Sequence, residues 1–237
     1  MQPPDAHPTR TPRLLALSGI VFAVLFLVGW FASGANSPDY GASDEDWTTW
    51  ADDNQWRTRI GAFSMLLAAF VFLHFAATIR SALGTHEAAD RASPYLARVA
   101  FAGGITGMAG ITMAIVMTSG ATTEGAEADP VVSRAVMTAS GGPFMLAAVG
   151  FAALLLAAGL LTLRTGVFAR WTGFVALIGA ASFLVTFAVL LQGTGEDGLF
   201  GYGFFPGVLA LVVWSIATSI ATYRLVATPP VTSTASD

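Results

Sequence analysis

The stretch that decides the fold is residues 143–191, PFMLAAVGFAALLLAAGLLTLRTGVFARWTGFVALIGAASFLVTFAVLL. It contains two runs of 21 residues, 143–163 and 171–191, without any Asp, Glu, Lys or Arg. In an α-helix that rises about 1.5 Å per residue, each run reaches about 30 Å, the thickness of the hydrocarbon core of a bilayer. Seven residues, 164–170, separate the two runs, and so short a turn makes consecutive helices antiparallel neighbours. The stretch therefore predicts a transmembrane hairpin.

Four more uncharged runs predict four more spans, at 14–33, 60–79, 99–118 and 204–223. Together the six runs predict an all-α, polytopic membrane protein, a single six-transmembrane-helix bundle over residues 14–226. Residues 1–13 and 227–237 are rich in Pro, Thr, Ser and Ala, so we expect disordered tails there. The first run has 20 residues, more than the apolar core of about 7–15 residues in a cleaved signal peptide, so we expect it to be retained as a span.

Arginine placement predicts the orientation of the chain. There is no lysine, so the 11 basic residues are all arginine. With the N-terminus in the cytoplasm, eight arginines lie inside and three outside, as the positive-inside rule favours. We therefore predict a multi-pass protein of the cell's inner (plasma) membrane with both termini cytoplasmic. Arginines at the inner ends of the spans should lie at one level and contact anionic lipid; they are Arg80, Arg98, Arg164, Arg170 and Arg224.

Composition excludes several classes of protein. Hydrophobic residues make up 54% of the chain and charged residues 11%, against about 25% charged in a soluble domain. This excludes a disordered chain, a nucleic-acid-binding domain and an ordinary soluble enzyme. The absence of cysteine excludes disulfides, thiolate catalysis, zinc-thiolate sites and cysteine-ligated iron–sulfur clusters. The runs contain no carboxylate, no lysine and one histidine, His74, which argues against an ion-coupled carrier, a retinal pigment and a bis-histidine haem. We accordingly assign no catalytic residue, no metal and no cofactor, and we expect the lipid bilayer as a partner.

Two segments between the runs carry local helix signals. In ASDEDWTTWADDNQW, residues 42–56, Ser43 and Asp46 have the spacing of a capping box, and Trp47 and Trp50 share a face. We expect a short amphipathic helix on the membrane surface here; the alternative, a calcium site, lacks the ligand spacing of a calcium loop. Residues 131–140, which precede a Gly-Gly-Pro sequence, predict an interfacial or protruding helix.

Gly103, Gly107 and Gly110 form a stripe of small residues on the third run. Small residues let helix backbones approach closely inside a membrane, where no hydrophobic force drives helices together. The stripe predicts a helix crossing.

The most distinctive polar feature of the runs is His74, on the cytoplasmic half of the second run. A buried imidazole needs a hydrogen-bond partner, so we predict that it turns toward hydroxyl groups at similar depth in the first and last runs. Two interpretations stay open: a packing contact between helices, or the polar end of a cavity for a small neutral or lipid-like ligand. The candidate ligand-binding residues are His74, Ser18, Ser215, Thr218, Ser219 and Thr222.

The segment LRTGVFARWTGFVALIGA, residues 163–180, resembles the signature hairpin of a bacterial family of six-span integral membrane proteins, a domain of unknown function. In that family Pro-Arg-Trp-x-Gly opens a span after a basic or small polar turn. Arg170, Trp171 and Gly173 match this pattern, and Ala169 stands where proline is usual. Similarity of overall topology extends over about 200 residues. The resemblance implies the six-span architecture and no chemistry.

Three classes of function are consistent with these features. A non-enzymatic accessory or assembly protein requires only packing faces and an interfacial helix, and it is the function we predict, with other membrane proteins as partners. The alternative is a binder or carrier of a small neutral or lipid-like solute. A membrane enzyme ranks third, because it needs convergent ionisable groups. A cavity of several hundred Å³ lined by His74 and hydroxyls would favour the binder.

Overall fold

The computed structural model describes residues 15–34, 38, 42–89, 95–123, 130–186 and 199–227. Throughout these residues the regular structure is α-helical, which confirms the all-α prediction. The helices are α2 (Ser18–Gly34), α3 (Asp44–Ala89), α4 (Tyr95–Thr123), α5 (Pro130–Ala139), α6 (Gly141–Thr165), α7 (Arg170–Thr186) and α9 (Leu199–Ala227). The two expected tails lie outside the described residues, except for Ala227 at the end of α9.

Among the residues that the structure describes, four segments are long and apolar enough to cross a membrane: Asp44–Glu87, Tyr95–Thr122, Val131–Thr165 and Gly203–Leu225. Helices α2 and α7 are also apolar, but each has 17 residues, and the uncharged runs that overlap them, 14–33 and 171–191, include residues that the structure does not describe. The structure is therefore that of a helical, membrane-type protein. Six crossings and the side on which the termini lie remain predictions.

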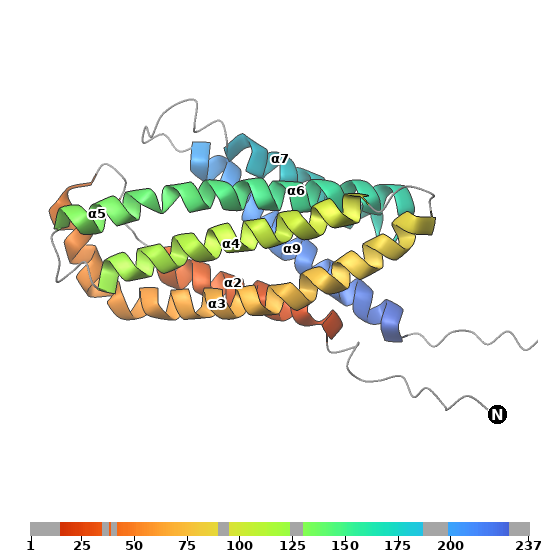
Figure 1. The fold of residues 1–237 in the computed structure, drawn as a ribbon, viewed down its shortest axis with the longest axis horizontal. Helices are drawn as coiled ribbons and strands as arrows, with labels where there is room; N and C mark the ends of the chain where they lie inside the picture. The colour runs from red at the N-terminus through yellow and green to blue at the C-terminus, as the bar shows by residue number, and fades with distance from the viewer. Residues whose placement is uncertain are drawn as a thin grey trace, which may run out of the picture.

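The helices form a closed bundle in chain order. α2 packs on α3, α3 on α4, α4 on α6, α6 on α7 and α7 on α9, and α9 returns to α2. The helices run roughly along the long axis of the molecule (Figure 1). At one end lies α5; at the other, α2 begins, α3 and α9 end, α4 begins, and α6 connects to α7 (Figure 1). We call these the α5 end and the α3–α4 end.

Aromatic side chains from different helices fill the centre of the bundle. Phe22 of α2 packs on Phe72 of α3 with ring centroids 4.8 Å apart, and Trp214 of α9 packs edge-on against Phe75 of α3 at 5.8 Å. All four side chains are buried, and tilted or edge-to-face pairs are the favoured geometry for such rings. The core therefore ties α2 and α9 to α3.

The outer surface of the bundle is apolar as well. Several large side chains on it are more than half exposed: Phe31, Phe63, Phe70, Phe174, Ile178 and Leu209. A soluble monomer rarely leaves so many large apolar side chains exposed, whereas lipid chains can cover them. The surface agrees with the membrane-type composition of the helices.

The glycine stripe lies where α4 crosses α6, as predicted. A Cβ atom at Gly103 would lie 2.7 Å from the backbone oxygen of Gly150, and one at Gly110 would lie 2.6 Å from the backbone nitrogen of Ala147. At Gly107 the same atom would meet the ring of Phe151 at 2.5 Å. Real Cβ atoms do not approach other atoms this closely, so backbone contact between α4 and α6 requires these glycines.

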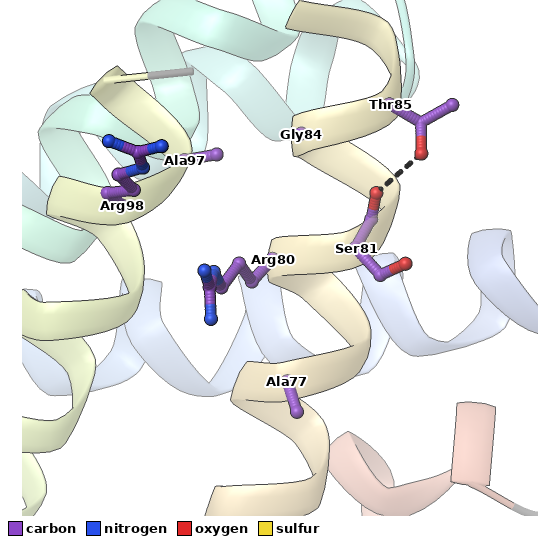
Figure 2. Close-up of a pocket in the computed structure, with 7 residues that line it drawn as sticks. All are labelled: Ala77, Arg80, Ser81, Gly84, Thr85, Ala97 and Arg98. Atoms are coloured by element: carbon purple, nitrogen blue, oxygen red, sulfur yellow. Dashed lines mark hydrogen bonds between the residues drawn. The ribbon is translucent and has the colours of Figure 1, made fainter. Parts of the chain in front are cut away.

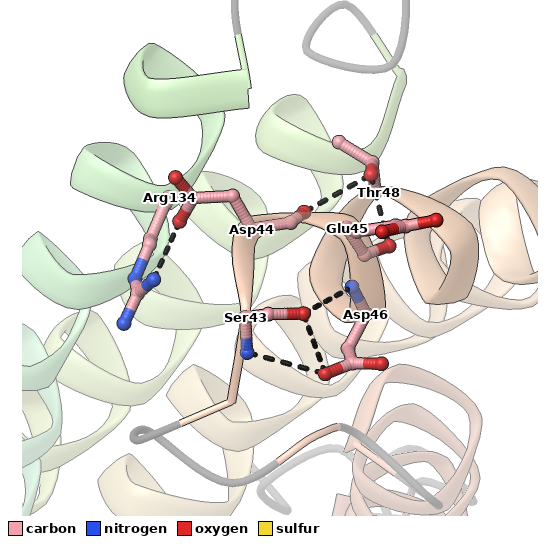
Figure 3. A network of polar contacts seen from close by, with 6 residues as sticks. All are labelled: Ser43, Asp44, Glu45, Asp46, Thr48 and Arg134. Atoms are coloured by element: carbon pink, nitrogen blue, oxygen red, sulfur yellow. Dashed lines mark hydrogen bonds and ion pairs between the residues drawn. The ribbon is translucent and has the colours of Figure 1, made fainter.

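Helix α3 differs from the prediction at its start. The capping box is confirmed, because the Asp46 backbone N–H donates to Ser43 Oγ and the Ser43 N–H donates to the Asp46 carboxylate, both at 3.2 Å (Figure 3). The expected separate helix on the membrane surface is wrong, since α3 continues unbroken to Ala89. No glycine or proline stands between Ser43 and Gly61 to end a helix.

The α5 end has a small core of its own, formed by Trp50, Ala51, Ala121 and Met137. Arg134 of α5 forms an ion pair with Asp44 at the start of α3 (Figure 3). The hydroxyl groups of Thr58 of α3 and Thr122 of α4 are hydrogen-bonded at 2.7 Å. The predicted helix ahead of Pro143 thus exists as α5 and is docked on α3 and α4.

Candidate ligand-binding groove between α3 and α4

His74 does not meet the hydroxyl groups that were expected to surround it. Its side chain is exposed on the outer face of α3, and its ring contacts that of Phe70 edge-on at 5.3 Å. The predicted turn toward the first and last runs is therefore wrong. The reason is the side of α3 that faces the bundle. The buried side chains of α3 recur every three or four residues, and His74 lies on the opposite side of the helix. These buried side chains are Met65, Ala68, Phe72, Phe75, Ile79 and Leu83.

The hydroxyl face of α9 is buried, but it serves packing between helices. Gly19 of α2 lies directly against Ser219. Thr218 and Thr222 donate to backbone oxygens one turn earlier in α9, both at 2.8 Å, as hydroxyl groups in membrane helices commonly do. Ser18 likewise donates to the Leu15 oxygen at 2.6 Å. Because His74 lies on the outer face, no cavity lined jointly by His74 and these hydroxyls is formed.

A groove opens instead between α3 and α4, near the α3–α4 end. It has a volume of about 510 Å³ and is lined by Ala77, Arg80, Ser81, Gly84 and Thr85 of α3 and by Ala97 and Arg98 of α4. Figure 2 shows the Arg80 side chain extending from α3 toward α4, whereas the Arg98 side chain lies over α4 itself in this view. The volume lies within the range of small-molecule sites.

Neither Arg80 nor Arg98 forms an ion pair with a carboxylate among the described residues. The ion pair found there joins Arg134 and Asp44. The Arg80 guanidinium carbon lies 5.2 Å from the centroid of the Phe101 ring, a cation–π contact that leaves the N–H donors available. Two guanidinium groups without an anion can form bidentate hydrogen bonds to a phosphate or carboxylate. The groove is therefore a candidate site for an anion.

A buried carboxylate holds the α4 side of the groove in place. Glu87 is 3% exposed, and its two oxygens accept the backbone N–H groups of Leu96 and Ala97 at 2.9 and 3.0 Å. These are among the N–H groups that a helix start leaves without internal partners. The carboxylate of α3 thus caps α4 immediately before Arg98. Sequence reasoning missed Glu87, because capping signals are sought next to a helix start and this acid lies eight residues before Tyr95.

The floor of the groove is open because of Gly84. A Cβ atom there would meet one neighbour within 4 Å, Ala97 Cβ, at 3.9 Å. Ser81 and Thr85 flank it, and the Thr85 hydroxyl donates to the Ser81 backbone oxygen at 2.9 Å (Figure 2). A larger side chain at position 84 would thus occupy the groove without displacing the backbone.

The other predicted lipid-contacting arginines also belong to helix ends at the α3–α4 end. Arg164 lies in the last turn of α6, Arg170 begins α7 and Arg224 lies in the last turns of α9; all three are exposed. Contact of these side chains with anionic lipid remains a prediction. Within the part of the chain that the structure describes, no group of three His, Asp or Glu side chains is arranged to hold a metal ion.

Comparisons of the whole chain with protein-family models, with curated proteins and with solved structures each found no match, so the resemblance of residues 163–180 to a six-span family remains a hypothesis.

Proposed function

We propose that the protein is a non-enzymatic accessory protein of the cell membrane that binds an anionic, lipid-like ligand in the groove between α3 and α4. In this proposal the chain crosses the membrane six times and the groove faces the cytoplasmic headgroup layer. The observation that carries the proposal is the pair of arginines, Arg80 and Arg98, that share an open groove without a carboxylate between them.

The position of the groove favours a lipid over a soluble anion. Arg80 directly follows the uncharged run 60–79 and Arg98 directly precedes 99–118, so both side chains should reach the headgroups. The lining residues contain no carboxylate and no imidazole, so a general base for hydrolysis of a bound ester is missing from them. The groove therefore supports binding, and its charge favours an anionic ligand over the neutral one considered from the sequence.

Charge removal tests the proposal. Arg80→Gln and Arg98→Gln should each lower the affinity of the purified full chain for phosphatidylglycerol by about ten-fold or more, since hydrogen bonds to charged groups contribute about 1.5–3 kcal/mol. Native mass spectrometry of the protein in detergent measures the bound fraction. Arg59→Gln is the matched control, because Arg59 is exposed on the same helix toward its other end. Equal lipid binding by the three variants and the wild type would refute the proposal.

Occlusion of the groove gives a test that leaves the charges in place. Gly84→Leu should abolish the same lipid adduct while the fold is retained, because the new side chain enters open space. Gly120→Leu adds the same side chain to α4, where an added Cβ meets no atom within 4 Å, and should bind lipid normally. Undiminished binding to Gly84→Leu would place the ligand outside the groove.

A further inference from the structure

We infer that Phe101 of α4 is a positioning residue for the anion site: its ring holds the Arg80 guanidinium at the groove through a cation–π contact, so that Arg80 is already in place when the anion binds. The inference rests on the proposed function and adds a residue that acts on the anion only through Arg80. Phe101 lies within the uncharged run 99–118, where the sequence shows it as one apolar side chain among many.

The Arg80 side chain is exposed on α3 and extends toward α4 (Figure 2). Fixing a long arginine side chain in one orientation costs conformational entropy, and this cost weakens ligand binding unless the free protein has already met it. Among the described residues no carboxylate forms an ion pair with Arg80. The contact that the structure shows for its guanidinium carbon is with the Phe101 ring, whose centroid lies 5.2 Å away, within the range of cation–π interactions.

The bundle holds the Phe101 ring in place. Phe101 is partly buried and packs against the main hydrophobic core. Together with Leu154 of α6, Trp214 of α9 and Arg80 itself, it lines an inner cavity of about 10 Å³. A cavity of this size has room for about one water molecule, so neither the ring nor the guanidinium can move inward. The ring is therefore a fixed surface that confines Arg80 to the groove.

An aromatic ring can orient Arg80 without competing with the ligand. A carboxylate in the same place would neutralise the guanidinium and occupy its N–H groups in a bidentate pair. The face of a ring attracts the cation and takes up no hydrogen-bond donor, so the five N–H donors of the guanidinium stay available. The contact thus prepares Arg80 for a phosphate and preserves its charge.

A double-mutant cycle tests this role. Phe101→Leu removes the ring and should lower the affinity of the purified full chain in detergent for phosphatidylglycerol by about 2- to 30-fold, the range that corresponds to one cation–π contact. In the Arg80→Gln background the same exchange should change the affinity by less than about two-fold, because the contact is already absent. Phe144→Leu is the control: it makes the same exchange at a partly buried position in the first turn of α6 and should bind like the wild type.

Ring fluorination tests the nature of the contact at nearly constant volume. Each fluorine atom withdraws electron density from the face of the ring and so weakens its attraction for a cation. The affinity for phosphatidylglycerol should therefore fall stepwise as phenylalanines with increasing numbers of fluorine atoms are incorporated at position 101. A ring that only fills space would give the same affinity throughout the series.

The outcomes separate this inference from the proposed function. If Arg80→Gln weakens binding but Phe101→Leu binds like the wild type, the role of Phe101 is wrong and the anion site stands. If Phe101→Leu lowers affinity equally with and without Arg80, Phe101 acts through packing and the inference fails. Tighter binding by Phe101→Leu would mean that the ring holds Arg80 away from the ligand, which also contradicts it. If Arg80→Gln and Arg98→Gln bind lipid like the wild type, the proposed function itself fails.

Discussion

At the scale of single residues, Glu87 connects the architecture of the α3–α4 end to the groove. A buried carboxylate is costly unless it is hydrogen-bonded, and the two N–H groups that it accepts are the compensation. The same contact fixes where α4 begins relative to α3. Since Arg98 follows Ala97 directly, the carboxylate also fixes the position of one of the two groove arginines.

Removal of this carboxylate should affect both stability and binding. Glu87→Ala leaves two N–H groups at the start of α4 without their acceptor, and should lower the free energy of unfolding by about 1–3 kcal/mol. Thermal denaturation in detergent measures the change, and lipid affinity should fall as well because Arg98 loses its support. Glu45→Ala, at an exposed position in the first turn of α3, is the control. If Glu87→Ala is as stable as the wild type, the cap contributes nothing to the free energy of unfolding.

Residue-level features of the site were predictable to different degrees. Arg80 and Arg98 were named from the sequence, because charges that bracket an apolar run are visible there. Their shared groove was not predictable, because it depends on the pairing of α3 with α4 and on the absence of a side chain at Gly84. The burial of His74 was predicted wrongly, although the spacing of Phe72, Phe75 and Ile79 already marks the opposite face of α3 as the inner one.

At the scale of elements, the uncharged runs located the cores of the helices but not their ends. A charge does not end a helix, so α3 extends 16 residues before the run 60–79 and ten residues after it. The first of these extensions builds the core of the α5 end, and the second carries Arg80, Gly84 and Glu87 to the groove. The glycine stripe was predictable as a crossing, whereas its partner helix, α6, was known only from the structure.

The α4–α6 crossing should be the part of the bundle most sensitive to added volume. Gly107→Leu would place its side chain into the ring of Phe151 and against α6, and should cost about 1–3 kcal/mol or more, since overpacking forces backbones apart. Size-exclusion chromatography and thermal denaturation in detergent report the loss of the folded monodisperse protein. Gly142→Leu, at an exposed position of α6 where an added Cβ meets no atom within 4 Å, should behave like the wild type.

At the scale of the whole molecule, charge is divided between the two ends. The α5 end carries an acidic cluster in the first turns of α3, with Asp44, Glu45 and Asp46, and the α3–α4 end carries the groove arginines and those of α6, α7 and α9. The 25 residues of α6 extend about 37 Å, which exceeds the hydrocarbon thickness. Under the positive-inside rule the α3–α4 end should face the cytoplasm.

Cysteine accessibility tests this orientation directly, because the chain contains no cysteine of its own. Ala169 in the turn between α6 and α7 and Thr138 near the end of α5 are both exposed, so a thiol at either position can react wherever the reagent is present. In intact cells an impermeant maleimide should label Thr138→Cys and leave Ala169→Cys unlabelled, and permeabilised cells should show both labelled. Labelling of Ala169→Cys alone in intact cells would invert the topology and place the groove in the outer leaflet. Labelling of both would mean that α6 does not separate two compartments.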